Sequence, residues 1–102
     1  MSKMTLEAIR QNPWAAVTDE LTPDAEPSLL RAAYFAAQKL ADEATETMIA
    51  IAQRSEVAEK WTQVDDAQFK GCLDRWCQVS KRLHEIAERD ERIAKLLRRR
   101  YA

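Results

Sequence analysis

The chain has 102 residues and a formal net charge of -1, and 46% of its residues are hydrophobic while 32% are charged. This length predicts one domain. A disordered chain would combine few apolar residues with a large net charge, so the composition excludes that class. No apolar run approaches the roughly 20 residues of a membrane helix, and no secretory signal is visible. We therefore expect a cytoplasmic protein without membrane contact.

Helix-breaking residues are confined almost entirely to the first quarter of the chain. All three prolines come before residue 28, and Gly71 is the one glycine. Good helix formers dominate the remainder. The two cysteines, Cys72 and Cys77, are five residues apart, which on one helix is too far for a disulfide, so we interpret them as reduced thiols. The composition and spacing predict an all-α protein.

Residues 1–27 are predicted to be an N-terminal segment of short helices ending in a connector interrupted by proline. Thr5 is a candidate cap for the first helix, and Asn12 followed by Pro13 is typical of the start of a second. Pro23 and Pro27 then interrupt the chain. The apolar side chains available for packing are Leu6, Ile9, Trp14, Val17 and Leu21.

The first long helix is predicted over about residues 28–60. Its apolar residues recur at heptad spacing, and in its first half Leu29, Tyr34 and Phe35 widen the apolar surface well beyond one stripe. A helix that is apolar on several sides is buried on several sides. Phe35 and Ile49 lie behind the main seam, so a single partner helix cannot cover all of this surface.

A turn over residues 61–66 is predicted to lead into a second long helix over about residues 66–99. Thr62 and Asp65 have the spacing of a capping box. The seam of the second helix alternates by three and four residues and consists of Phe69, Cys72, Trp76, Val79, Leu83, Ile86, Ile93 and Leu97. Asp90 occupies a core position of this heptad pattern. We expect it to mark a weak point, a hydrated gap or a buried pair with Arg31 or Arg54.

The fold predicted from these elements is a long antiparallel helical hairpin over residues 28–102, preceded by the segment of residues 1–27. A hairpin alone buries one stripe per helix, so the remaining apolar surface needs another cover. The N-terminal segment could complete a three-helix unit, or a second copy could complete a dimeric four-helix bundle. Trp61 and Trp76 lie on core stripes and are interpreted as core residues.

Catalytic and metal-binding motifs are weak or missing. Cys77 and His84 are one heptad apart and could supply two metal ligands or a nucleophile with its base, but structural zinc takes four ligands, and a cysteine inside a helix has nothing to lower its pKa. Glycine-rich phosphate loops are excluded by the single glycine. The sequence therefore predicts no enzyme, no cofactor and no metal.

The charge distribution is asymmetric: residues 1–27 carry a net charge of -3, and residues 61–102 carry +3. The basic residues Lys95, Arg98, Arg99 and Arg100 complement a helix C-terminus, or contact an acidic protein or phosphates. In an antiparallel hairpin these arginines should lie beside Asp24 and Glu26.

Elimination favours a small non-catalytic protein–protein interaction module, such as an accessory subunit, adaptor or inhibitor of a larger assembly. The candidate partner-binding residues are Trp14, Leu29, Tyr34, Phe35 and Ile49. Exposed aromatic residues are typical anchors of protein interfaces. The alternative is a nucleic-acid-associated accessory factor that uses the basic C-terminal end, and a helical enzyme or metal protein is the third hypothesis.

Overall fold

The computed structural model describes residues 2–101, with the side chain of Tyr101 left out; Met1 and Ala102, at the outer ends of the two predicted regions, lie outside it. The protein is all-α, as predicted. Its helices are α1 (Leu6–Gln11), α2 (Ala15–Thr18), α3 (Pro27–Ala58), α4 (Gln63–Ala87) and α5 (Glu91–Tyr101). Strands are missing from this described range, where the one β-type contact is an isolated bridge between Lys3 and Glu20.

Capping residues explain where the helices begin. The Thr5 hydroxyl accepts a hydrogen bond from the Ala8 amide (3.0 Å) at the start of α1. Pro27 opens α3, where its missing N–H needs no partner. At α4 the predicted capping box is confirmed, because Thr62 and Asp65 each accept a hydrogen bond from the other's backbone amide. Local sequence therefore determines these helix starts.

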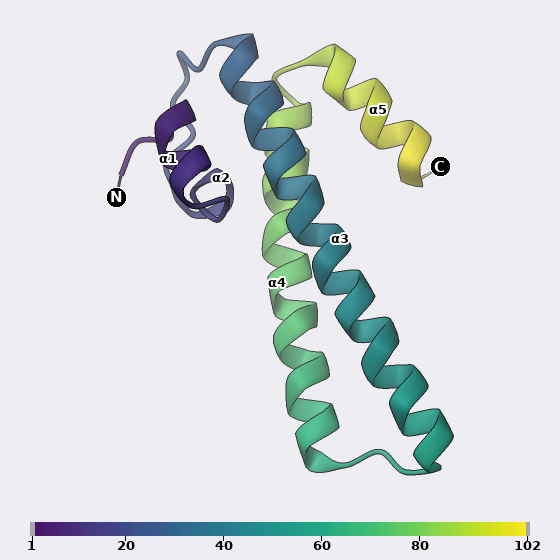
Figure 1. The fold of residues 1–102 in the computed structure, drawn as a ribbon. Coiled ribbons are helices and arrows are strands. Elements are labelled where there is room, and N and C mark those ends of the chain that lie inside the picture. Colours follow the sequence, from purple (N-terminus) through teal and green to yellow (C-terminus); the bar gives the residue numbers. More distant parts are fainter. Residues whose placement is uncertain (1, 102) are drawn as a thin grey trace.

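The two longest helices, α3 and α4, form an antiparallel hairpin against which the other helices pack (Figure 1). Their shared seam buries Ile51 of α3 and Cys72, Val79, Leu83 and Ile86 of α4. Glu59 ends α3 in the left-handed region, with φ of 53°, and lets the chain reverse. Both predicted long helices exist, although α3 covers residues 27–58 and α4 begins at Gln63, slightly before residue 66.

The second long helix does not continue to residue 99, contrary to the prediction. It ends at Ala87, the chain turns over residues 88–90, and α5 folds back (Figure 1). Asp90 causes this break: its carboxylate accepts from the Arg92 amide (2.9 Å), and its carbonyl accepts from the Ala94 amide (2.9 Å). Asp90 is thus the cap of α5.

Of the alternatives left open for Asp90, a pair with Arg31 or Arg54 is therefore not the one observed. Arg54 instead pairs with Asp65, at 2.5 Å between Nη2 and Oδ1, and Arg31 is exposed. The heptad pattern predicted a continuous helix over residues 66–99, but the same spacing of apolar residues is also compatible with a turn between two helices. Asp90 caps the helix that follows the turn, and burial of Ile93 and Leu97 against the core favours the turn over a continuous helix.

The short helix α5 packs on one side of the hairpin through Ile93 and Leu97, which are both buried. Its last turn reaches α3, where Arg100 forms an ion pair with Asp42. Arg98 pairs with Glu91 of its own helix at 3.0 Å. The expectation that the arginines lie beside Asp24 and Glu26 is therefore wrong, because α5 turns back along the hairpin.

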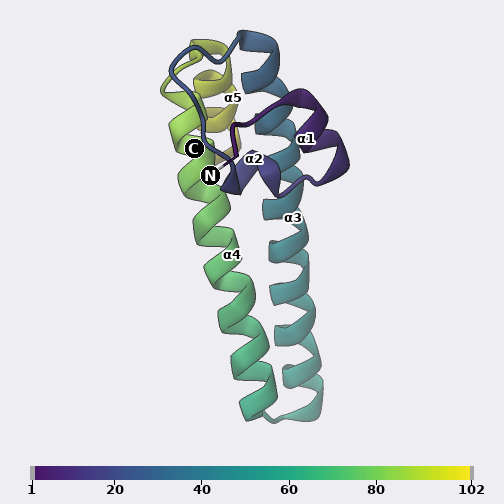
Figure 2. The same cartoon turned by 90° about the vertical axis from the view of Figure 1, so that its left-hand side faces the viewer.

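The N-terminal segment packs on the opposite side of the hairpin from α5, as the two perpendicular views agree (Figures 1 and 2). Its buried residues are Met4, Ile9, Ala15 and Ala16. Arg82 of α4 holds it by donating to the carbonyls of Asp19 (2.8 Å) and Ala16 (3.3 Å). Arg89 donates to the Leu21 carbonyl at 3.1 Å. The segment thus packs as a third element on the hairpin, which is one of the two covers that the sequence left open.

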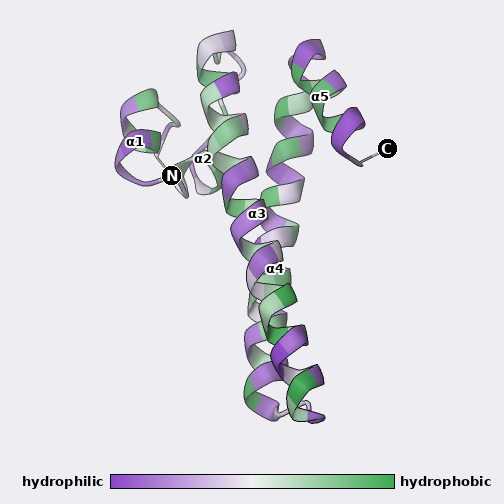
Figure 3. Cartoon of the chain, turned by 45° about the vertical axis from the view of Figure 1, so that its right-hand side comes forward, coloured by the Kyte–Doolittle hydropathy of each residue, from purple (hydrophilic) through white to green (hydrophobic). Residues whose placement is uncertain are grey.

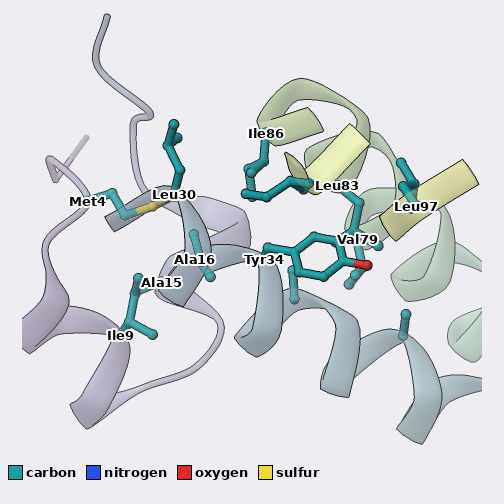
Figure 4. Packing of buried hydrophobic residues seen from close by; sticks show 14 residues of the cluster. Met4, Ile9, Ala15, Ala16, Leu30, Tyr34, Val79, Leu83, Ile86 and Leu97 are labelled. Atoms are coloured by element: carbon teal, nitrogen blue, oxygen red, sulfur yellow. The ribbon is translucent and has the colours of Figure 1, made fainter. Parts of the chain in front are cut away.

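The core is concentrated at the end of the hairpin where these elements meet. Tyr34 of α3 lies among Val79, Leu83 and Leu97 there (Figure 4). The other end is a bare pair of helices, and the molecule is correspondingly elongated, with extents of 51 × 31 × 17 Å. Its radius of gyration is 15.7 Å, whereas a compact chain of this length has about 13 Å.

Candidate interaction surface

Helix α4 carries further apolar residues beside its core seam, at Leu73 and Ala87, with the small polar residue Ser80 between them. Alongside the core seam, a second stripe runs at alternating four- and three-residue spacing. This second stripe consists of Phe69, Leu73, Trp76, Ser80, Leu83 and Ala87. A face of this width is broad enough to be covered by two neighbouring helices.

Within the chain, α5 provides that second neighbour only at one end of the stripe. A groove of about 820 Å³ separates α4 from α5. Its apolar lining includes Trp76, Leu83 and Ala87 of α4 and Leu97 of α5, and His84 lies on its wall. Beyond Trp76, toward the hairpin turn, the stripe continues through Leu73 and Phe69. Figure 3 shows that apolar residues recur along the two long helices below α5.

Heptad spacing places two exposed residues, Leu73 of α4 and Ile49 of α3, on one side of the hairpin. Leu73 lies one heptad from Ser80, which lines the groove beside α5. Ile49 lies one heptad from Asp42, which pairs with Arg100 of α5. Residues seven apart lie on the same helix face, so Leu73 and Ile49 are both on the side that α5 occupies further along.

Trp61, in the hairpin turn, extends this surface to the tip. Its ring meets Phe69 edge-on, with centroids 5.6 Å apart. The indole Nε1 donates to Asp66 Oδ1 at 3.3 Å. Asp66 is one heptad from Leu73, so the indole is tied to the same side of α4.

We call Ile49, Trp61, Phe69, Leu73 and Trp76 the open face. Three of them are markedly exposed: Ile49 (51%), Trp61 (47%) and Leu73 (40%). Phe69 and Trp76 are half-buried, since the core seam and the second stripe share them. Isolated exposed apolar residues are ordinary, but a contiguous patch of this kind is typical of an interaction site.

The opposite side of the hairpin offers a useful contrast. Val64 of α4 is 63% exposed, yet it lies nine residues from Leu73, which is two and a half turns and places it on the other side. It is five full turns from Arg82, which holds the N-terminal segment. Val64 is therefore apolar and exposed but outside the open face.

An ionic network around the buried Asp65 supports the tip. Asp65 accepts from Arg54 and from Ser55, whose hydroxyl lies 3.2 Å from Oδ2. The Thr62 amide donates to the same carboxylate at 3.1 Å. The amide of Thr62, followed by the Arg54 guanidinium, lowers the pKa of Asp65 to about 2, so this carboxylate is charged and fastens the two helices near the turn.

The structure separates the five predicted partner-binding residues. Tyr34 is buried at 4% exposure and belongs to the core, while Leu29 and Trp14 are half-buried against it. Phe35 is 62% exposed and stacks edge-on with Tyr34. Of the five, Ile49 belongs to the open face, and Phe35, two heptads before it, lies on the same side of α3.

Sequence analysis missed Leu73 and interpreted Trp61 and Trp76 as core. The signal that could have found Leu73 and Trp76 is the second stripe on α4. The predicted anion-contacting residues Lys95, Arg98, Arg99 and Arg100 are all exposed on α5. Arg98 and Arg100 are engaged by Glu91 and Asp42 respectively.

Grouped metal-ligating side chains are not found in the described part of the chain, where no three His, Cys, Asp or Glu residues gather around a common point. Cys72 and Cys77 are free thiols, the first buried and the second exposed. No helix in residues 2–101 is both long and apolar enough to cross a membrane.

Comparison with known protein families, curated proteins and solved structures finds no match to this chain. The open face and the groove that continues it are thus the features from which function is argued.

Proposed function

We propose that this chain is a small non-catalytic protein–protein interaction module, acting as an accessory subunit, adaptor or inhibitor of a larger assembly. Its binding surface is the open face together with the groove between α4 and α5. The observation that carries the proposal is that α4 is apolar enough for two helical neighbours along its length but has a second neighbour only at one end.

The chemistry of this surface suits an apolar helix better than a small polar molecule. The large side chains that line the groove, Trp76, Leu83 and Leu97, are aromatic or aliphatic, and its lining also includes charged residues such as Glu88 and Arg98. Aromatic anchors surrounded by a polar rim are the usual composition of protein interfaces. An amphipathic helix binds such a groove by inserting apolar side chains that are spaced three and four residues apart.

The test is site-specific photocrosslinking in the organism that encodes the protein. A photoreactive amino acid is placed at Leu73 in one variant and at Val64 in a matched control. We expect a crosslinked protein at position 73 and little or none at position 64. Equal crosslinking at both positions, or none at either, would refute the proposal.

The same experiment addresses the nucleic-acid alternative. A photoreactive group at Arg99 that yields an adduct removed by nuclease, with no protein adduct at position 73, would favour an accessory factor bound to nucleic acid through α5. The existing ion pairs of Arg98 and Arg100 reduce the charge that α5 has available for phosphates.

A further inference from the structure

We infer that the occupant of the open face is a second copy of this chain, placed antiparallel, so that the tip of each hairpin reaches α5 of the other copy. This inference rests on the proposed function, because it names the partner of the same surface. Three properties of the described chain support it: its surface area, its shape and the distribution of charge along its axis.

The surface area is too large for a self-contained protein of this mass. The accessible surface is 6999 Å², whereas a compact monomer of 11.7 kDa exposes about 5,900 Å². The excess is therefore about 1,100 Å², which exceeds the roughly 800 Å² that each partner buries in a standard interface. A second copy that covered the bare half of the hairpin would remove most of this excess.

The shape selects the antiparallel direction. Ser55 is level with Asp65, to which it donates a hydrogen bond, and the end of α5 is level with Asp42, through Arg100. Thirteen residues of α3 separate these levels, or about 20 Å at 1.5 Å per residue. The open face is thus a recess of that length, with α5 standing beside it at one end.

In a parallel dimer the two α5 helices would lie at the same end of the interface and would clash sterically before the open faces could meet. An antiparallel copy fits. The half of each hairpin that α5 leaves uncovered packs against the same half of the other copy, and α5 of each copy lies just beyond the hairpin turn of the other. The Phe69, Leu73 and Trp76 positions of the two α4 helices then pack together in an isologous contact, as two-fold symmetry requires. Trp61 of each copy approaches the mouth of the other copy's groove.

Charge favours the same direction. Five basic residues and one acidic residue lie in positions 91–100, while four acidic and two basic residues lie in positions 53–66 around the tip. Glu56 is one heptad from Ile49, so it lies on the open side of α3. In the antiparallel dimer, Glu56 and Glu59 of each copy approach Arg98 and Arg99 of the other. Such exposed pairs set direction more than affinity.

Sedimentation equilibrium of the purified full chain at micromolar concentration tests the dimer. We expect twice the chain mass of 11.7 kDa. Leu73→Glu, and independently Ile49→Glu, should give monomers with an unchanged far-UV circular dichroism spectrum, since both side chains are exposed. Val64→Glu, the matched control, should remain dimeric. A wild-type monomer at high micromolar concentration, or equal loss in the Val64→Glu variant, overturns the inference.

Charge reversal tests the direction. Arg98→Glu with Arg99→Glu should weaken the dimer about tenfold, as should Glu56→Arg with Glu59→Arg, and all four changes in one chain should restore it. In a parallel dimer, reversing the charge of Arg98 and Arg99 or of Glu56 and Glu59 would leave the affinity unchanged, and that result would overturn the inference. A monomer that still crosslinks a different protein at position 73 would refute the second copy while leaving the proposed function intact.

Discussion

Removing the carboxylate of Asp90 should destabilise the protein, although heptad spacing alone predicts the opposite. The Asp90 side chain accepts from the Arg92 amide at 2.9 Å and approaches the Ile93 amide at 3.4 Å. These amides are in the first turn of α5 and have no partner within the helix. In Asp90→Ala they lose their acceptor, while the turn that separates α5 from α4 loses the residue that specifies it.

The expected loss of stability in Asp90→Ala follows from the two contributions that hold α5 in place. Loss of an N-terminal cap costs about 1 kcal/mol, within a range of about 0.5–2 kcal/mol. Burial of Ile93 and Leu97, which are 2% and 7% exposed, contributes about 1.5–3 kcal/mol for each side chain. Because the second contribution is larger, α5 should stay docked. We therefore expect nearly unchanged helicity and a melting temperature lower by about 4–8 °C.

Thermal unfolding followed by far-UV circular dichroism measures this change. Asp90→Asn and Asp90→Ser retain a capping acceptor and should melt close to the wild type. Asp90→Leu is the decisive variant, because it places an apolar residue at the heptad core position and would stabilise a continuous helix over residues 63–101. A higher melting temperature for Asp90→Leu would refute the role of Asp90 as a cap and the break between α4 and α5.

Three further predictions concern the core, the tip and the N-terminal segment. Ile86→Ala, at a site with 0% exposure, should lower the free energy of unfolding in urea by about 2–5 kcal/mol. The pKa of Asp65 is about 2, below its ordinary 3.8, so its contribution to stability is full above the ordinary value and declines as pH falls toward about 2. Asp65→Asn should flatten the fall in melting temperature over that range. Arg82→Ala removes hydrogen bonds to two carbonyls and should speed proteolysis of residues 2–26 while the α3–α4 hairpin stays protected.

The candidate surface could be predicted only in part. Ile49 was identifiable because it lies behind the seam of a helix whose main partner is evident from the heptad pattern. Tyr34 was predicted to bind a partner because it widens the apolar surface of the first long helix, yet it is buried in the core that α5 helps to form. Trp61 and Leu73 are exposed because α5 is too short to reach them, and no local pattern reports the path of a distant helix.

By itself, the sequence determined the helical class, the hairpin and the starts of α1, α3 and α4. These depend on propensity, on periodicity and on caps such as Thr5, Pro27 and Thr62, all of which act over a few residues. Only the tertiary structure decided that α4 ends at Ala87. A stripe with one polar interruption describes a continuous helix and a helix–turn–helix equally well. The choice depends on whether Ile93 and Leu97 gain more by folding back onto the core around Tyr34 than by extending beyond it into water.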